Sequence, residues 1–165
     1  MKISVFCTVA VVCAAALTAC GGGGDSGGES HAPYQITLRA DRTVLPLNVA
    51  GYPPGTGANA PFTTTLYVNA TEDGRPIPGG EKDVFACDIK EGLDSGALYY
   101  LDGDEEHEKD GKPVSYRSIT LGANSGGSSF HFHAGNQAGD VKITCSVQDP
   151  RDKKLHSASV NIRVS

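Results

Sequence analysis

The chain has 165 residues and a formal net charge of −5, so its length suits one domain with its own hydrophobic core. The acidic balance argues against nucleic acid as a partner, because nucleic-acid-binding domains need a basic surface. The same balance argues against direct adsorption to anionic lipid head groups.

The first predicted element is a short apolar segment at the amino terminus. Lys2 is followed by an apolar run over residues 3–19, whose last residues, Leu-Thr-Ala, directly precede Cys20. A run this short and this close to the start is typical of a secretory signal rather than of a spanning helix. The small residues before the cysteine resemble the bacterial lipoprotein signal, in which that cysteine carries the lipid. The alternative is a plain secretory signal with a chance cysteine.

The lipoprotein resemblance divides the chain into a signal peptide (residues 1–19), a lipidated Cys20 with a tether (residues 20–32), and a folded domain (residues 33–165). The tether consists mainly of Gly and Ser and has no apolar residue that can pack, so we expect a flexible linker. If acyl chains such as palmitate are attached to Cys20, their burial in a bilayer would contribute ~0.8 kcal/mol of binding free energy per CH₂. In the sorting rule of such lipoproteins, glycine after the cysteine favours the outer membrane of the cell envelope.

Beyond the tether, the sequence predicts strands and no amphipathic helix. Nine segments show apolar–polar alternation or enrichment in Thr, β-branched and aromatic residues: 34–40, 43–49, 62–71, 83–89, 97–101, 116–121, 128–133, 140–147 and 155–164. Segment 51–61 is rich in Gly and Pro and is a predicted loop, segment 72–80 is a predicted turn, and segment 102–112 is a charged loop. Seven to nine short strands with turn signals about every ten residues predict an all-β antiparallel β-sandwich.

The cysteines divide between the signal and the domain. Cys7 and Cys13 lie in the predicted signal peptide and Cys20 carries the lipid, which leaves Cys87 and Cys145 in the folded part. Two thiols in an exported chain are expected to form a disulfide bond. The alternatives are a buried free pair or half of a metal site.

Three stretches resemble bacterial immunoglobulin-like domains of the invasin and intimin class. Residues 63–79 (TTTLYVNATEDGRPIPG) are similar to the second strand and following turn of those domains. Residues 125–132 and 138–149 are similar to their G-x-A-x-F and A-G-x-V-x-I-T-A segments. The resemblance implies an immunoglobulin-like sandwich that acts as a spacer or adhesive module, with the strands of Cys87 and Cys145 adjacent in one sheet. The chain departs from the family in having a single copy rather than a tandem array.

Two patterns suggest metal ligands. His131 and His133 alternate with Phe130 and Phe132, and on a strand both histidines project from one face, where they can share an ion. The favoured alternative is that the phenylalanines fill the core and the histidines face water. The acidic loop over residues 102–110 offers carboxylates to calcium but lacks the spacing of a calcium-binding loop, so a solvated loop is favoured there.

The chain has no nucleophile elbow, HExxH motif or phosphate-binding loop, so we expect neither an enzyme nor a cofactor. The first functional hypothesis is an envelope lipoprotein that presents its domain for adhesion or contact with another protein, and whose lipid on Cys20 is its membrane contact. The second is a periplasmic metal-binding module that uses His131 and His133 or the acidic loop. The third is a hydrolase with an unrecognised site.

Overall fold

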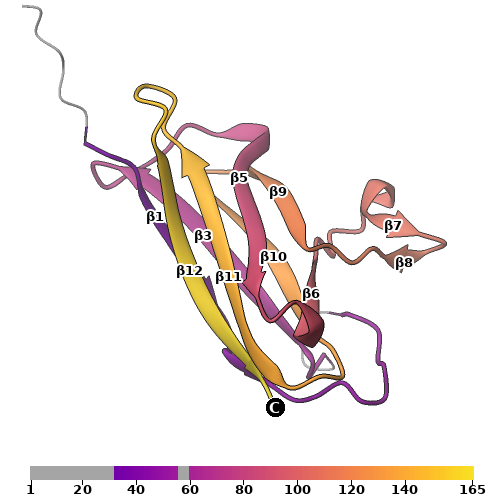
Figure 1. The fold of residues 1–165 in the computed structure, drawn as a ribbon. Helices are drawn as coiled ribbons and strands as arrows, with labels where there is room; N and C mark the ends of the chain where they lie inside the picture. The colour runs from indigo at the N-terminus through magenta and orange to yellow at the C-terminus, as the bar shows by residue number, and fades with distance from the viewer. Residues whose placement is uncertain (1–31, 56–59) are drawn as a thin grey trace, which may run out of the picture. The chain divides into compact units, whose positions relative to one another are not determined.

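The computed structural model describes residues 32–55 and 60–165, except the side chains of residues 81 and 82 (Figure 1). All described residues belong to one compact unit. The predicted signal peptide, lipidation at Cys20 and the tether up to residue 31 lie outside the described residues. Within the described part, no helix is long and apolar enough to cross a membrane.

Two sheets form the body of the domain (Figure 1). The first has the order β1-β3-β10-β6, with β4 beside β3, and all its pairs are antiparallel. Its strands are β1 (Gln35–Ala40), β3 (Thr63–Glu72), β4 (Arg75–Pro76), β6 (Gly96–Tyr99) and β10 (Gly127–Ala134). Because β6 is short, it pairs with β10 only over His131–Ala134.

The second sheet has the order β2-β12-β11-β5-β9, in which only the β2–β12 pair is parallel. Its strands are β2 (Val44–Leu45), β5 (Gly80–Glu91), β9 (Ser118–Ala123), β11 (Gly139–Gln148) and β12 (Leu155–Val164). A 3-10 turn, η1 (Leu93–Ser95), directly precedes β6. A second one, η2 (Glu105–His107), precedes a small hairpin formed by β7 (Glu108–Lys109) and β8 (Lys112–Pro113).

The predicted all-β sandwich is confirmed, but the number of strands is larger than the seven to nine expected. The described residues form twelve strands, of which β2, β4, β7 and β8 have two residues each. Such short pairs are set by turns and neighbouring strands rather than by an alternating pattern, so the sequence does not signal them. The other eight strands fall within the expected number.

The strand order matches that of an immunoglobulin-like sandwich with one addition. The strands β1, β3, β10 and β6 occupy the places of A, B, E and D in a constant-type domain, and β12, β11 and β5 occupy those of G, F and C. The addition is β9, which joins the edge beside β5 although it follows β6 in the chain. The chain therefore passes from β6 in the first sheet to β9 in the second sheet, and then back to the first sheet with β10.

The core lies between the two sheets and follows the predicted alternation. In β11 every second residue from Val141 to Val147 is buried, and in β5 the same holds from Phe85 to Ile89. Phe130 and Phe132 of β10 are fully buried from the opposite sheet. Inward-facing residues of both sheets thus fill one apolar layer, as expected for a sandwich.

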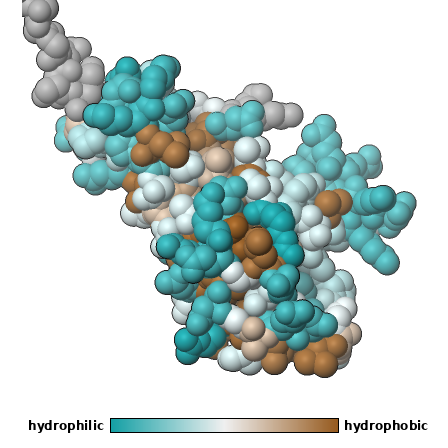
Figure 2. Space-filling view, in the orientation of Figure 1, coloured by the Kyte–Doolittle hydropathy of each residue, from teal (hydrophilic) through white to brown (hydrophobic). Residues whose placement is uncertain are grey.

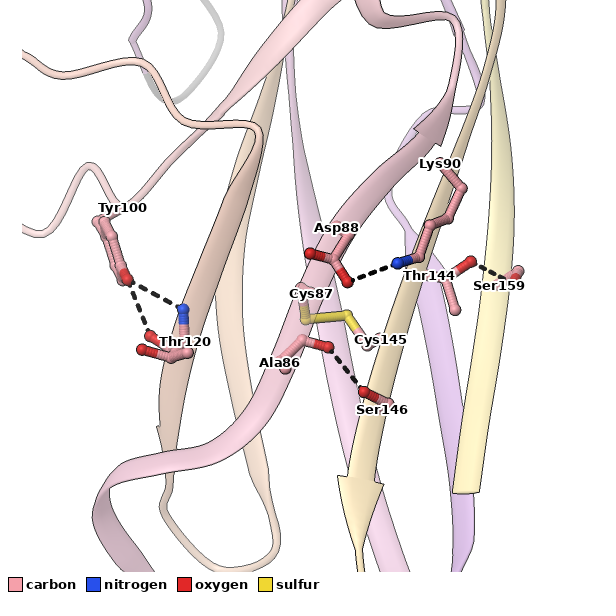
Figure 3. The surroundings of a disulfide bond; sticks show 10 residues. All are labelled: Ala86, Cys87, Asp88, Lys90, Tyr100, Thr120, Thr144, Cys145, Ser146 and Ser159. Atoms are coloured by element: carbon pink, nitrogen blue, oxygen red, sulfur yellow. Dashed lines mark hydrogen bonds and ion pairs between the residues drawn. A yellow bond between two sulfur atoms is a disulfide. The ribbon is translucent and has the colours of Figure 1, made fainter. Parts of the chain in front are cut away.

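The predicted disulfide is present in the structure (Figure 3). Cys87 of β5 lies directly opposite Cys145 of β11 in the antiparallel register, and both residues are fully buried. The bridge spans 58 sequence positions. It joins neighbouring strands of one sheet, whereas the bridge of antibody domains connects B and F across the two sheets.

A tight turn connects β9 to β10, which belong to different sheets. Ser125 and Gly126 have φ values of 49° and 79°, the left-handed conformations that a two-residue hairpin turn requires. A Cβ added to Gly126 would lie 2.9 Å from the carbonyl oxygen of Ala70 and 2.8 Å from the Cβ of Pro76. Glycine therefore lets this turn pack against the first sheet while β9 and β10 separate.

Candidate functional site

The acidic loop forms an ordered structure, which we call the acidic hairpin (residues 102–113, containing η2, β7 and β8). Oδ1 of Asp102 accepts a hydrogen bond from the backbone N–H of Asp104 at 3.1 Å. Oδ1 of Asp104 accepts one from the N–H of Glu106 at 3.0 Å and so caps η2. Short acidic side chains favour such local turns, so these two carboxylates shape the loop that the sequence predicted only as charged.

Tyr100 attaches the acidic hairpin to the sandwich. Its ring stacks on that of His107, with centroids 3.6 Å apart, and His107 Nδ1 lies 2.9 Å from Oδ2 of Asp102. The Tyr100 hydroxyl donates to the carbonyl oxygen of Thr120 at 2.9 Å and accepts from its N–H at 3.2 Å (Figure 3). The hairpin is thus held against the outer edge of β9.

A groove of about 1050 Å³, which we call the acidic groove, lies between the acidic hairpin and the adjoining parts of β9 and β10. Four carboxylates line it, those of Asp83, Asp102, Asp104 and Glu106, and all four residues are exposed. No Lys or Arg is among its lining residues in the part of the chain that is described. Figure 2 shows the hairpin as a hydrophilic projection beside the sandwich.

Two strand edges contribute backbone groups to the acidic groove. Both backbone groups of Thr120 turn away from β5 to meet Tyr100, so by alternation those of Gly122 turn the same way. In β10, the backbone N–H of Ala134 donates a hydrogen bond to the carbonyl oxygen of Phe62, on the side of β3. Because backbone groups alternate in direction along a strand, those of the odd-numbered residues of β10 point toward β6. Ser129 precedes the segment that β6 covers, and its backbone groups therefore face the groove.

The two histidines of β10 lie on the outer face of the first sheet, opposite Phe130 and Phe132, but they do not face open water. His133 is only 8% exposed, and His131 is half-buried. The expectation of water-facing histidines is wrong for His133 because residues 48–52 fold over this face, through contacts that alternation along β10 cannot signal.

Both ring nitrogens of His133 and Nδ1 of His131 have protein partners. His133 Nδ1 lies 2.8 Å from Oγ1 of Thr63, and its Nε2 lies 2.9 Å from the carbonyl oxygen of Tyr52. His131 Nδ1 lies 2.9 Å from the carbonyl oxygen of Tyr100. An ion bound by His133 would have to replace one of the contacts of its ring, and metal binding by the two histidines stays a prediction.

Burial of the two histidines predicts a pH-dependent stability. Desolvation lowers the pKa of His133 and of His131, and the backbone carbonyls of Tyr52 and Tyr100 oppose this only in part. In the unfolded chain both histidines take up a proton near pH ~6.5. The unfolded state therefore binds more protons below that pH, and stability is lost as the pH falls from ~6.5 through the lowered folded-state values. The urea midpoint should be lower at pH 5 than at pH 7.5.

The double variant H131Q/H133Q is the control for this prediction. Its urea midpoint should change less between the two pH values than that of the wild type, whatever its absolute stability. Carboxylates with a lowered pKa, such as that of Asp149, also stabilise the fold, but their contribution is lost only at more acidic pH. Equal wild-type midpoints at both pH values would contradict the prediction.

Sequence reasoning missed a third cluster, at the turn between β11 and β12. Asp149, Asp152 and His156 place one possible metal-ligand atom each within 4.8 Å of one another, and this is the one such group of three found among the described residues. Neither the acidic hairpin nor the two histidines of β10 belong to it. A D-x-x-D-x-x-x-H spacing across a predicted turn is the signal that could have indicated it.

The carboxylates of this cluster are already neutralised by cations. Arg151 donates to Asp149 through Nε at 2.9 Å and through its terminal nitrogen at 2.6 Å, and this bonding lowers the pKa of Asp149 to about 2. Arg151 also pairs with Glu72, and Lys154 Nζ lies 3.2 Å from Asp152. His156 Nε2 is buried and has no hydrogen-bond partner. A metal ion would have to displace Arg151 from Asp149. We therefore infer that this cluster stabilises the β11–β12 turn.

Comparison with known proteins adds no relative. No protein-family model matches the sequence, and no curated protein does so. The resemblance to invasin- and intimin-class domains therefore stays a prediction.

Proposed function

We propose that the protein is a lipid-anchored protein of the bacterial cell envelope, in the outer membrane, that presents a non-catalytic immunoglobulin-like domain to another protein. The observation that supports a binding role is the acidic groove, in which four carboxylates of one sign and two strand edges lie together. The anchor rests on the sequence Leu-Thr-Ala before Cys20 and on the Gly- and Ser-rich tether.

The largest pKa shifts among the described residues are explained by an ion pair that holds a turn. Strongly shifted pKa values are typical of catalytic groups. The strongest shifts in this domain belong to Asp149 and Arg151, which form an ion pair at the β11–β12 turn, away from the groove lining. In the groove, the carboxylates of Asp102 and Asp104 accept hydrogen bonds that order the hairpin.

Site-specific crosslinking in cells tests this function. A photoreactive amino acid at Ser129, which is exposed and lines the acidic groove, should form an adduct with a second protein in the membrane fraction. The same amino acid at Asn161, which is exposed on β12 and outside the groove, is the matched control. The adduct should be absent or much weaker at Asn161. No adduct at Ser129, or equal adducts at both positions, would refute a groove-directed protein contact.

A further inference from the structure

We propose that the acidic groove binds a lysine- or arginine-rich segment of the partner protein in an extended conformation. This inference rests on the proposed function and specifies the partner's chemistry at the same site.

The charge of the groove selects a cationic occupant. The carboxylates of Asp83, Asp102, Asp104 and Glu106 line one hollow with no described Lys or Arg among them, and a cleft lined by one sign of charge concentrates its field. Phosphate-bearing ligands are repelled by that field. A sugar would need an open aromatic face, and the ring of Tyr100 is already stacked on His107.

The arrangement of the carboxylates fits several spaced cations better than one metal ion. No three of these groups bring ligand atoms within 4.8 Å of one another, since the described group that does so lies at the β11–β12 turn. Asp102 and Asp104 each turn an oxygen toward the hairpin backbone. Lysine and arginine side chains on a flexible stem can reach separate carboxylates, which a single small ion cannot do.

The strand edges favour an extended backbone in the occupant. The backbone groups of Gly122 and Ser129 face the groove and can pair with a segment laid along it, as in strand addition to a sheet edge. Two glycines, Gly80 and Gly122, are among the lining residues. Because glycine has no side chain, a peptide backbone can approach these positions closely.

Peptide binding to the full-length protein in a neutral detergent tests the inference. The probe is a fluorescein-labelled heptapeptide that alternates Lys and Val, and the reference is the same peptide with Glu in place of Lys. Anisotropy at low salt should show saturable binding of the lysine peptide and none of the glutamate peptide, and added salt should weaken the binding. Binding of both peptides alike would overturn the proposal.

Two triple variants with the same change of net charge locate the binding. D83N/D104N/E106Q removes three groove charges and keeps short polar side chains at the cap and at the left-handed position of residue 83. It should weaken binding about tenfold, from the loss of three partly screened ion pairs. D73N/E108Q/D110N removes three exposed charges outside the groove lining and should bind like the wild type. An equal loss of affinity in both variants would show that the peptide is held only by general charge attraction, and it would overturn the groove as the binding site.

A third peptide tests the extended backbone, and the combined outcomes separate the two proposals. Replacing every Val by Pro keeps the charge but removes the backbone donors at those positions, so this peptide should bind more weakly. Equal binding would overturn the backbone pairing. Loss of all peptide binding with an intact Ser129 crosslink would overturn this inference alone, whereas peptide binding without a crosslink would refute the proposed cellular contact alone.

Discussion

Replacing both Cys87 and Cys145 by alanine is expected to lower the free energy of unfolding by about 4 kcal/mol. The bridge spans 58 positions, and cutting it restores the conformational freedom of that loop to the unfolded chain. A loss of this size is a large share of the net stability of a small domain, ~5–15 kcal/mol. Urea unfolding of the oxidised wild type and of the double variant, followed by circular dichroism, measures the difference.

Reduction separates the covalent link from the volume of the side chains. Treating the wild type with a reductant in the unfolded state should bring its urea midpoint close to that of C87A/C145A, and the variant should not respond to reductant. Because both cysteines are fully buried in the core, any remaining difference reports the packing of the sulfur atoms. A reduced wild type as stable as the oxidised one would contradict the assigned role of the bridge.

Local alternation carried most of the fold prediction. In β11 and β5 the period of two placed the inward residues correctly, including both cysteines, because each strand has one face in the core. The predicted turn at residues 72–80 begins with Asp73 and Gly74, whose φ values of 49° and 73° let the chain reverse between β3 and β4. The position of β9 at the far edge of the second sheet could not be predicted in this way, because sheet membership is set by contacts between distant strands.

The candidate site was predicted less completely than the fold, because it depends on non-local contacts. The sequence shows the charges of residues 102–110, but the acidic groove exists only because Tyr100 holds the hairpin against Thr120. The burial of His133 depends on Asn48 and Tyr52, more than 80 positions earlier in the chain. Composition can therefore indicate which chemistry is available, while long-range packing decides where it meets.

The groove also explains how the domain leaves a strand edge open without exposing an apolar one. Edge strands risk pairing with other chains, and natural proteins protect them with charge or with covering segments. Tyr100 blocks the edge of β9 at Thr120, and the acidic hairpin surrounds the part that remains open around Gly122. The same carboxylates that we propose select a cationic partner would thus repel acidic strands, and they would disfavour apolar ones because a buried carboxylate loses its water without gaining a partner.

Replacing Cys20 by serine is expected to abolish attachment of the processed protein to the membrane through a lipid. Attachment of this kind depends on several acyl chains on one cysteine, since a single chain gives only marginal binding. An acidic domain has no electrostatic attraction to anionic membranes to take their place. In fractionated cells the wild type should sediment with the membranes and be released by detergent but not by high salt. The C20S variant should carry no lipid: it should either keep its signal segment or, once that segment is cleaved, appear in the soluble fraction.

Cys13 provides the matched control, because it lies in the predicted signal peptide, which would be cleaved from the mature protein. The C13S variant should remain with the membranes as the wild type does, so that loss of attachment is specific to position 20. Mass spectrometry of the amino-terminal peptide should find it to begin at an acylated Cys20. A mature chain that still begins at Met1, a free thiol at Cys20, or a processed C20S variant in the membrane fraction would each contradict the anchor. Since the acidic groove was inferred from the folded domain alone, its peptide binding would stand even then, and only the place where it acts would change.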